Sequence, residues 1–322
     1  MNCLCCGKPL NTSAASDQWH KKCIQSFFGT ANLPDIDISD EVLNQLAIDS
    51  TSKGFTVPGV QKKLSLHLTE DDSPRLTLVN YPTGYILKPP TEEYPALPEM
   101  EYLVMQMAQA TDIKTVPFAL IRMSSHASTL AYITKRIDRV FGKILGMLAM
   151  EDFCQLDGRL TEDKYRGSYE RCGKVIEKYS ARPGLDLSEL FIRVVFSFAV
   201  GNSDMHLKNF SLIETSIGNG EYVLSAAYDI LSTNVILPAD QEQFALTMNG
   251  KKQHIRRNDF LRFGEAIGLQ QNAAERMMEK IVKCEDRYLE LCENSYLPND
   301  MKKQLKSLIR ERISVIRKST YS

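Results

Sequence analysis

The sequence has no excess of charge of either sign and no long hydrophobic run. It carries 39 basic and 40 acidic side chains in 322 residues, so no bulk electrostatic field draws it to nucleic acid or to an anionic bilayer. Its longest strongly apolar run, near 190–200, is interrupted by Arg193 and is too short to cross a membrane. The N-terminus lacks the charged and apolar regions of a signal peptide. With 43% apolar residues, the sequence predicts a globular, cytoplasmic protein with no membrane partner.

The cysteines are unevenly distributed, which argues against a disulfide framework. Four of the eight lie in the first 23 residues, a pattern typical of a metal site in a reducing compartment. The spacing C-x2-C-x13-H-x2-C offers Cys3, Cys6, His20 and Cys23 as four ligands of a structural zinc ion, with Cys5 to spare. The alternative is a flexible tail with free cysteines.

Hydrophobic periodicity divides the rest of the chain into a β-rich part and a helical part. After a Cys/His-rich head at 1–30, we expect a β-rich lobe at 31–140 and a helical lobe at 141–322. In the first lobe a short helix is expected at 41–48, strands at 64–68, 76–79, 84–87 and 130–134, and a further helix at 99–110. In the second lobe helices are expected at 145–156, 187–200, 259–267, 273–291 and 301–316. A Gly/Asn turn at 217–220 predicts a β-hairpin across 210–228. This order predicts an α+β, protein-kinase-like, two-lobed fold.

The segment 201–210 carries the strongest chemical signal. Phosphoryl transfer needs a carboxylate that orients the attacking hydroxyl and an oxygen ligand for Mg²⁺, and kinases supply them as Asp and Asn five positions apart. Asp204 and Asn209 have this spacing, and Asp229 follows the predicted hairpin where a kinase has a metal-binding Asp. The alternative is that these side chains only cap turns, which is their commonest role in loops.

A second signal lies upstream of this segment. Lys88 ends a predicted strand, as the phosphate-contacting Lys of a kinase does, and Glu101 lies near the start of the helix that follows. No G-x-G-x-x-G motif is present, and the candidate replacement is the loop at 56–64.

At this point the sequence resembles the HipA family of serine/threonine kinases, the toxin components of bacterial toxin–antitoxin pairs. The resemblance covers about residues 50–300. It is carried by the segments 57–63, 86–89, 101–102, 135–139, 151–155, 167–170, 201–210 and 228–229.

The resemblance implies roles for individual residues in binding ATP and Mg²⁺. Lys88 would contact the ATP phosphates, with Glu101 as its partner. The backbone from Lys135 to Ile137 would bind adenine. The nucleotide loop would include Thr56, Val57 and Gly59, and Thr56 would be the autophosphorylation site that switches the kinase off.

The catalytic loop receives its roles from the same resemblance. Asp204 would be the catalytic base, His206 a structural residue, and Lys208 a group that neutralises phosphate charge. Asn209 and Asp229 would hold Mg²⁺.

The resemblance also implies partners. The family phosphorylates aminoacyl-tRNA synthetases or other translation factors and binds helix-turn-helix antitoxins, so DNA would be reached only through the antitoxin. Long members begin with a β-rich subdomain, which a separate small protein could supply here. The sequence departs from the family at Thr56, where Ser is usual, at the neighbouring Pro58, and at Lys135, where Glu is frequent.

Two other functions compete with this prediction. The chain could be a pseudokinase or corepressor module that binds an antitoxin, although the retained Lys88, Asp204, Asn209 and Asp229 argue against it. It could instead phosphorylate a small molecule. The basic side chains at 301–318 could face nucleic acid, but a solvated helix face is the more usual reason for such a stripe.

Overall fold

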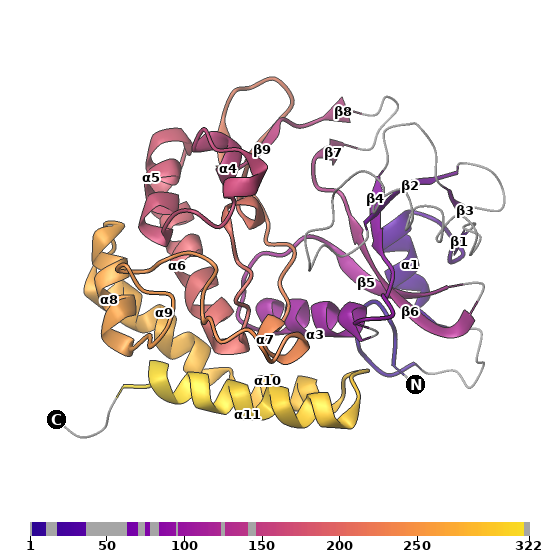
Figure 1. Ribbon diagram of the computed structural model, residues 1–322. Helices are drawn as coiled ribbons and strands as arrows, with labels where there is room; N and C mark the ends of the chain where they lie inside the picture. Colours follow the sequence, from indigo (N-terminus) through magenta and orange to yellow (C-terminus); the bar gives the residue numbers. More distant parts are fainter. Residues whose placement is uncertain are drawn as a thin grey trace. The chain divides into compact units, whose positions relative to one another are not determined.

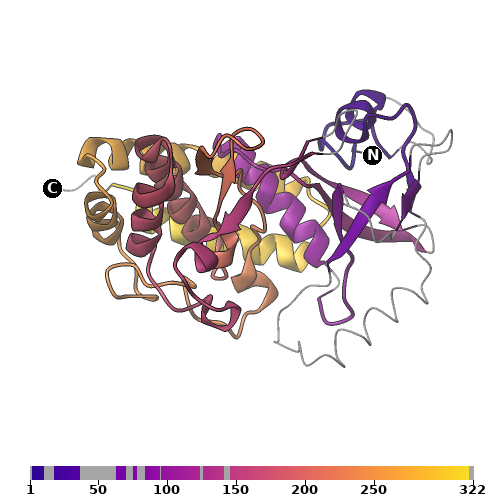
Figure 2. The same cartoon turned by 90° about the horizontal axis from the view of Figure 1, so that it is seen from above.

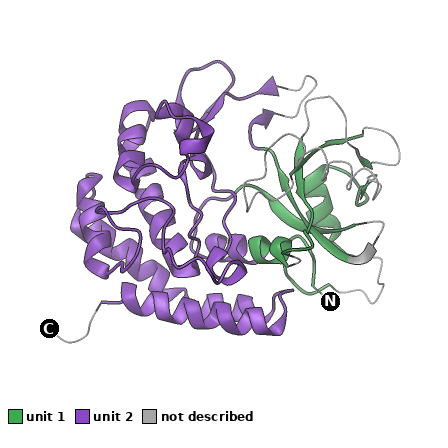
Figure 3. Cartoon of the chain, in the orientation of Figure 1, with its two compact units in different colours: residues 1–102, 116–136 green, residues 103–115, 137–322 purple. Residues whose placement is uncertain are grey.

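The computed structural model divides the chain into two compact units (Figures 1 and 3). Unit 1 contains residues 1–102 and 116–136, and unit 2 contains residues 103–115 and 137–322. The structure describes residues 2–10, 18–36, 63–69, 75–77, 84–94, 96–123, 126–140 and 146–318. The expected helix at 41–48 and residues 56–62 of the expected loop, with Thr56, Val57 and Gly59 among them, lie outside the described residues. The domain limits expected from the sequence stay a prediction.

Unit 1 is built on a mixed sheet. Among the described residues it has six strands: β1 (Asp35–Ile36), β2 (Leu64–Leu68), β3 (Arg75–Thr77), β4 (Tyr85–Lys88), β5 (Phe118–Met123) and β6 (His126–Lys135). Their order is β1-β3-β2-β4-β6-β5, with β1 parallel to β3 and the other pairs antiparallel. The strands expected near 64–68, 76–79, 84–87 and 130–134 correspond to β2, β3, β4 and β6. β5 was not predicted, because it is buried at nearly every position and shows no alternation.

Helix α1 (Lys21–Phe28) belongs to unit 1 and packs on this sheet (Figure 2). It begins after His20 and ends at Gly29, whose left-handed backbone (φ +78°) suits a residue without a Cβ. The rings of Phe27 and Phe28 lie 5.9 Å and 5.3 Å from the ring of Tyr85 on β4. The Cys/His-rich head is therefore packed against the sheet of unit 1.

A buried helix forms the core of unit 2. Helix α6 (Pro183–Val200) is buried along its whole second half and packs on α5 (Tyr169–Tyr179), α9 (Gln271–Lys283) and α11 (Asn299–Ile316). The charged residue that interrupts its apolar run, Arg193, donates to Glu189 at 2.8 Å and to the carbonyl of Ser225 at 2.7 Å. These bonds compensate the cost of burying the guanidinium group.

Other helices complete the two units. Helix α3 (Leu97–Ala110) begins in unit 1 and continues in unit 2 from Leu103 onward. Further helices of unit 2 are α7 (Thr233–Ile236), α8 (Arg257–Ala266), α10 (Glu285–Glu293) and two short 3-10 helices, η1 (Thr161–Asp163) and η2 (Leu207–Asn209). No helix in the described part of the chain is long and apolar enough to cross a membrane.

The predicted hairpin is present in unit 2 as β10 (Ser211–Glu214) and β11 (Tyr222–Leu224). The prediction of one helix at 145–156 is wrong. The chain instead forms β8 (Gly146–Met147), which pairs with β7 (Arg139–Val140), and then β9 (Met150–Asp152) and α4 (Phe153–Leu156). The cause is non-local, because β9 pairs with β10 some 60 residues away.

Two further helix predictions differ in detail from the structure. The single helix expected at 273–291 is divided at Cys284 into α9 and α10. The basic stripe of α11 is largely occupied within unit 2, since Lys306 pairs with Glu293 at 2.5 Å and Arg317 with Glu285 at 2.6 Å. Arg312 is buried over the ring of Phe198, 4.8 Å from its centroid. These contacts favour a structural role for the stripe.

Candidate functional site

The segment 201–210 forms a tight loop at the C-terminal end of α6. Gly201 turns the chain with a left-handed backbone (φ +69°). The side-chain amide of Asn209 then donates to the backbone carbonyl of Asp204 at 2.9 Å, and the amide of His206 donates to the same carbonyl at 2.8 Å. Because the side-chain NH2 group of Asn209 donates this hydrogen bond, the side-chain carbonyl oxygen Oδ1 is the atom suited to ligate a cation.

The start of this loop is anchored by a second set of hydrogen bonds. The backbone amide of Ser203 donates to the hydroxyl of Thr233 at 2.7 Å, and the Ser203 hydroxyl donates to Asp240 at 2.7 Å. The Thr233 hydroxyl in turn donates to the carbonyl of Gly201 at 3.3 Å. The loop is therefore held by α7 and the segment that follows it, so that Asp204 and Asn209 keep their relative position.

Asp204 accepts a hydrogen bond from Tyr165, which the sequence did not reveal. The Tyr165 hydroxyl lies 2.7 Å from Oδ1 of Asp204, and the Tyr165 ring meets the His206 ring edge-on at 5.1 Å. Partial burial and the negative charge of Asp204 raise the pKa of Tyr165, so the phenol stays protonated and acts as the donor. His206 is buried beside it.

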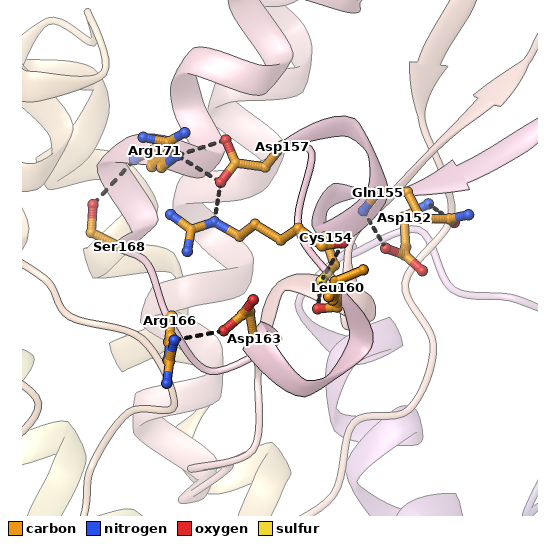
Figure 4. Close-up of polar contacts among 10 residues, drawn as sticks. Asp152, Cys154, Gln155, Asp157, Leu160, Asp163, Arg166, Ser168 and Arg171 are labelled. Atoms are coloured by element: carbon orange, nitrogen blue, oxygen red, sulfur yellow. Dashed lines mark hydrogen bonds and ion pairs between the residues drawn. The ribbon is translucent and has the colours of Figure 1, made fainter.

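A network of ion pairs holds the segment that carries Tyr165 (Figure 4). Asp157 accepts from Arg159 and from Arg171, the latter at 2.6 Å, and Arg166 pairs with Asp163 at 2.9 Å. Several charges that share partners are more effective than an isolated exposed pair. Asp157 therefore ties the start of the loop between α4 and α5 to the first turn of α5, whereas the pair of Arg166 and Asp163 shares no partner with it and its Arg166 side chain is 79% exposed.

Lys208 is paired with an acidic residue that also caps a helix. Its Nζ lies 2.6 Å from Oδ2 of Asp152, while Oδ1 of Asp152 accepts from the backbone amide of Gln155 at the start of α4. The carbonyl of Lys208 accepts from the Tyr228 hydroxyl at 3.0 Å. Asp152 thus couples the loop at 201–210 to β9 and α4.

Asp229 has an unusual backbone conformation. Its φ is +59°, in the left-handed region that few residues other than glycine adopt. Two residues earlier, the buried Ala227 donates its amide to the carbonyl of Lys114 at 2.7 Å. Residues held in such conformations are concentrated at functional sites, where surrounding contacts maintain the strain.

In unit 1 the structure brings together Lys88 and Glu101. Nζ of Lys88 lies 2.6 Å from Oε1 of Glu101, and the two side chains are 5% and 0% exposed. Nζ also lies 5.2 Å from the centroid of the Tyr132 ring, within the range of a cation–π contact. Glu101 lies in the second turn of α3, whereas the sequence placed it at the helix start.

The segment expected to bind adenine, 135–137, spans the point at which the chain passes from unit 1 to unit 2. The backbone amides of Lys135 and Arg136 donate to the carbonyls of Pro117 and Gly84, at 3.0 Å and 2.9 Å. Burial lowers the pKa of the Lys135 side chain. Ile137 is the first residue of unit 2 after this crossing. Because the Lys135 amide is already engaged, any adenine contact here depends on other backbone groups.

The head brings Cys3, Cys6, His20 and Cys23 together, with one ligand atom from each, all within 4.8 Å of one another. Nε2 of His20 bonds to the carbonyl of Pro9 at 3.0 Å; a carbonyl can only accept, so Nε2 carries the proton. In the neutral imidazole Nδ1 then carries the lone pair that can bind a metal ion, and it lies 3.4 Å from Sγ of Cys6 and 4.0 Å from Sγ of Cys23. A carbonyl partner that fixes the tautomer is the usual arrangement around a metal-ligating histidine.

Cys5 and Cys23 lie in a crowded thiol environment. Burial and the neighbouring thiols raise the pKa of Cys5 to about 12, and the same causes raise the pKa of Cys23. The Cys23 thiol therefore stays protonated unless a metal ion displaces its proton on binding. The backbone amide of His20 also donates to Sγ of Cys3 at 3.3 Å.

Together, the β-rich unit with its buried Lys–Glu pair and the helical unit with its Asp/Asn loop define a protein-kinase-like fold. Residues 55–288 match the family described as the HipA-like C-terminal domain, and the chain belongs to that family. The resemblance and fold class expected from the sequence are therefore confirmed.

Individual relatives agree with this assignment. The chain is 28% identical over 274 residues to a putative kinase of Haemophilus influenzae, an alignment covering 76% of this chain and 77% of that protein. It is 34% identical over 195 residues to the putative kinase Y4dM of Sinorhizobium fredii, covering 56% of this chain. The alignment spans 45% of Y4dM, less than half of that protein's length.

Two solved structures share the fold. HipA of Shewanella oneidensis MR-1, solved with HipB and operator DNA, superposes with a TM-score of 0.66 at 18% identity, over 81% of this chain and 66% of HipA. The proinflammatory kinase CtkA of Helicobacter pylori superposes with a TM-score of 0.55 at 16% identity, over 79% of this chain and 94% of CtkA. At these identities the likeness establishes the fold alone.

Proposed function

We propose that this protein is an ATP- and Mg²⁺-dependent protein serine/threonine kinase. The observation that carries the proposal is the loop in which Asn209 is hydrogen-bonded to the carbonyl of Asp204, in a chain of the HipA-like family. Kinases place their catalytic Asp and a metal-binding Asn on one such loop. The names of the relatives support kinase activity, and the acceptor residue is part of the proposal.

Asp204 and Lys208 are the two side chains of the loop that act on the reacting groups in this proposal. Asp204 accepts the proton of the substrate hydroxyl and orients it for in-line attack on the γ-phosphate. Lys208 neutralises charge on the transferred phosphoryl group, and Asp152 holds its ammonium group in place until substrate arrives.

The metal ligands fit the preference of Mg²⁺ for oxygen. Asn209 offers its carbonyl oxygen and Asp229 its carboxylate, a small ligand set of the kind that Mg²⁺ combines with waters and phosphate oxygens. When bound, Mg²⁺ compensates the negative charge of the phosphates. The left-handed backbone of Asp229 sets the direction in which its side chain leaves the chain.

The nucleotide contacts in unit 1 follow the same proposal. Lys88 binds the ATP phosphates, and its pairing with Glu101 holds the ammonium group ready in a buried environment. Adenine is bound by backbone groups between Lys135 and Ile137. The loop with Thr56, Val57 and Gly59 covers the phosphates, and phosphorylation of Thr56 adds up to two negative charges that expel it.

For the biological role, we propose a toxin of a toxin–antitoxin pair that phosphorylates an aminoacyl-tRNA synthetase or another translation factor. The fold shared with HipA, which was solved with HipB and operator DNA, supports a helix-turn-helix antitoxin as partner. DNA is then contacted only through that partner. A separate small protein equivalent to the N-terminal subdomain of long HipA proteins is a second expected partner.

We also propose a structural zinc ion at Cys3, Cys6, His20 and Cys23. Three thiolates and one imidazole fill a tetrahedral coordination sphere, so no position remains for substrate. The convergence of the four ligand atoms, which all lie within 4.8 Å of one another, supports this assignment over a flexible tail with free thiols.

The test of catalysis is phosphate transfer from labelled ATP to proteins of a bacterial lysate. Asp204→Asn and Asp229→Asn should each abolish transfer while the fold is kept, because an amide cannot accept the proton or supply the charge. Asp286→Asn, an equivalent change on the exposed surface of α10, is the control and should transfer like wild type.

Each alternative gives a different result in this assay. Transfer by Asp204→Asn at the wild-type rate would refute the role of Asp204. If the wild-type protein bound ATP but labelled nothing, the result would support the alternative that the chain is a pseudokinase. If label were found only on small molecules, the substrate would be a small molecule and not a protein.

The regulatory part of the proposal is tested separately. Mass spectrometry of the active protein should find phosphate on Thr56, and Asp204→Asn protein should carry none. Thr56→Asp should weaken ATP binding by charge repulsion. Active protein without phosphate between Thr51 and Ser65, or Thr56→Asp protein that binds ATP like wild type, would refute the switch.

A further inference from the structure

The head is hydrogen-bonded to β5, the strand at one edge of the unit 1 sheet. On β5, the backbone amide of Leu120 donates to the carbonyl of Leu4 at 2.9 Å, and the carbonyl of Leu120 accepts from Nε1 of Trp19 at 3.1 Å. Trp19 is 4% exposed and Leu120 is fully buried. The head therefore satisfies both backbone groups of Leu120 at a position where a sheet edge otherwise exposes them.

A second contact links the head to the residue beside Glu101. The hydroxyl of Tyr102, which is 3% exposed, donates to the carbonyl of Cys5 at 3.1 Å. The Tyr102 ring packs edge-on against Phe118 at 5.7 Å, and Phe118 stacks on Tyr132 at 6.1 Å. Tyr132 is the ring that faces Nζ of Lys88. Packed groups thus lead from the head to both sides of the Lys88–Glu101 pair.

The head residues that make these contacts lie between the cysteines. Leu4 and Cys5 are enclosed by Cys3 and Cys6, and Trp19 directly precedes His20. Within residues 2–10 the amide of Gly7 donates to the carbonyl of Cys3 at 2.8 Å and the amide of Cys3 to the carbonyl of Lys8 at 2.8 Å, and the amide of Leu4 donates to the carbonyl of Gln18 at 3.0 Å. A metal ion shared by the four ligand groups would fix this turn and Trp19 relative to each other.

We propose that the zinc ion keeps the head docked on β5 and that Tyr102 is a positioning residue for Glu101. The metal holds the carbonyls of Leu4 and Cys5 where Leu120 and Tyr102 donate to them. Tyr102 then fixes the turn of α3 from which Glu101 reaches Lys88. The link to nucleotide binding rests on the proposed kinase function, and the docking rests on the proposed zinc site alone.

The first experiment measures zinc and docking without reference to activity. Metal analysis should find about one zinc per chain in wild type and in Cys5→Ser, whose thiol lies outside the ligand group, and none in Cys3→Ser or Cys23→Ser. Trp19, the single tryptophan, reports docking directly. Its emission should shift to the red when a chelator removes zinc from wild type, and should return when zinc is restored.

Hydrogen exchange at the Leu120 amide gives an independent measure of docking. Exchange should speed up at least tenfold after chelation, because the acceptor carbonyl of Leu4 is released. Chelation and recovery in the wild-type protein avoid dependence on cysteine variants that fail to fold. Zinc-free wild type as purified, or zinc removal that leaves both Trp19 emission and Leu120 exchange unchanged, would refute the docking role.

The second experiment tests the link to ATP. Tyr102→Phe removes only the hydroxyl that binds the Cys5 carbonyl, and it should keep its zinc and its Trp19 emission. It should raise the KM for ATP about fivefold with kcat little changed, as expected for loss of one hydrogen bond. Zinc removal should weaken ATP binding of the wild type at least fivefold. It should weaken ATP binding of Tyr102→Phe by a clearly smaller factor.

The positioning role would be refuted if zinc removal weakened ATP binding of the wild type and of Tyr102→Phe equally. It would also be refuted if zinc removal left the ATP affinity of the wild type unchanged. Failure of the proposed function has a different signature. Wild-type protein that holds zinc and docks its head but binds no nucleotide would refute the kinase proposal, and with it the link to Lys88. The docking itself is decided by zinc content, Trp19 emission and Leu120 exchange alone.

Discussion

The buried pair of Lys88 and Glu101 allows a quantitative test of how the nucleotide-binding residues are held. The variants are Lys88→Met, Glu101→Leu and the double change, each close in volume to the residue it replaces. Removing one member takes away the opposite charge that lies 2.6 Å from the other, and breaking a comparable buried ion pair costs about 3–5 kcal/mol. Replacing both by apolar groups is close to neutral in such pairs.

The expected result is a strongly non-additive cycle. Each single change should lower the melting temperature by about 6–20 °C, and the double variant should recover most of the loss. A coupling free energy of about 3 kcal/mol or more follows. Both variants that lack Lys88 should lose ATP binding, so the double variant separates stability from function.

The assay is thermal and urea unfolding followed by circular dichroism, with Trp19 fluorescence reporting unit 1. Arg287→Met serves as the control, because its pair with Glu290 is 54% and 59% exposed and contributes less than about 1 kcal/mol. A double variant as unstable as the two single effects added together would refute the reasoning. Single variants within about 0.5 kcal/mol of wild type would refute it as well.

Two further predictions concern other positions. Burial raises the pKa of Glu99 from 4.5 to about 7, so the folded state binds more protons than the unfolded state between those values and stability falls as pH rises through them. Glu99→Gln should therefore raise the unfolding free energy by up to about 3 kcal/mol at pH 8 and leave it unchanged below pH 4.5, as urea unfolding at both values can verify. Gly201→Ala should destabilise the protein by about 1–3 kcal/mol, because the backbone is left-handed and the new Cβ would clash with the Leu308 side chain. Gly184→Ala, which meets no atom within 4 Å, is its control, and equal melting temperatures for the two would contradict the argument.

Local signals in the sequence identified much of the fold. The hairpin follows from the Gly/Asn turn, where Gly218 and Gly220 adopt φ of +73° and +69° that other residues avoid. The spacing of Cys3, Cys6, His20 and Cys23 also indicated side chains that the structure brings together, since it depends on one turn and the start of α1.

Non-local contacts could not be predicted in the same way. The helix expected at 145–156 is wrong because β9 pairs with a strand far along the chain, and no residue pattern within β9 carries that information. Tyr165 and Asp152 were missed as site residues for the same reason, since they contact Asp204 and Lys208 from 39 and 56 positions away. Asp152 at least lies in a segment that carries the family resemblance.

The hydroxyl of Tyr165 has a consequence for how acceptors are bound. It donates to a carboxylate oxygen of Asp204, which is what a substrate serine or threonine would do in the proposed reaction. An incoming acceptor therefore competes with a hydroxyl that the protein itself supplies at very high effective concentration. The measured affinity for any acceptor then contains the free energy of displacing Tyr165, and sequences that form additional contacts around the loop between α4 and α5 are favoured over those that present the hydroxyl alone.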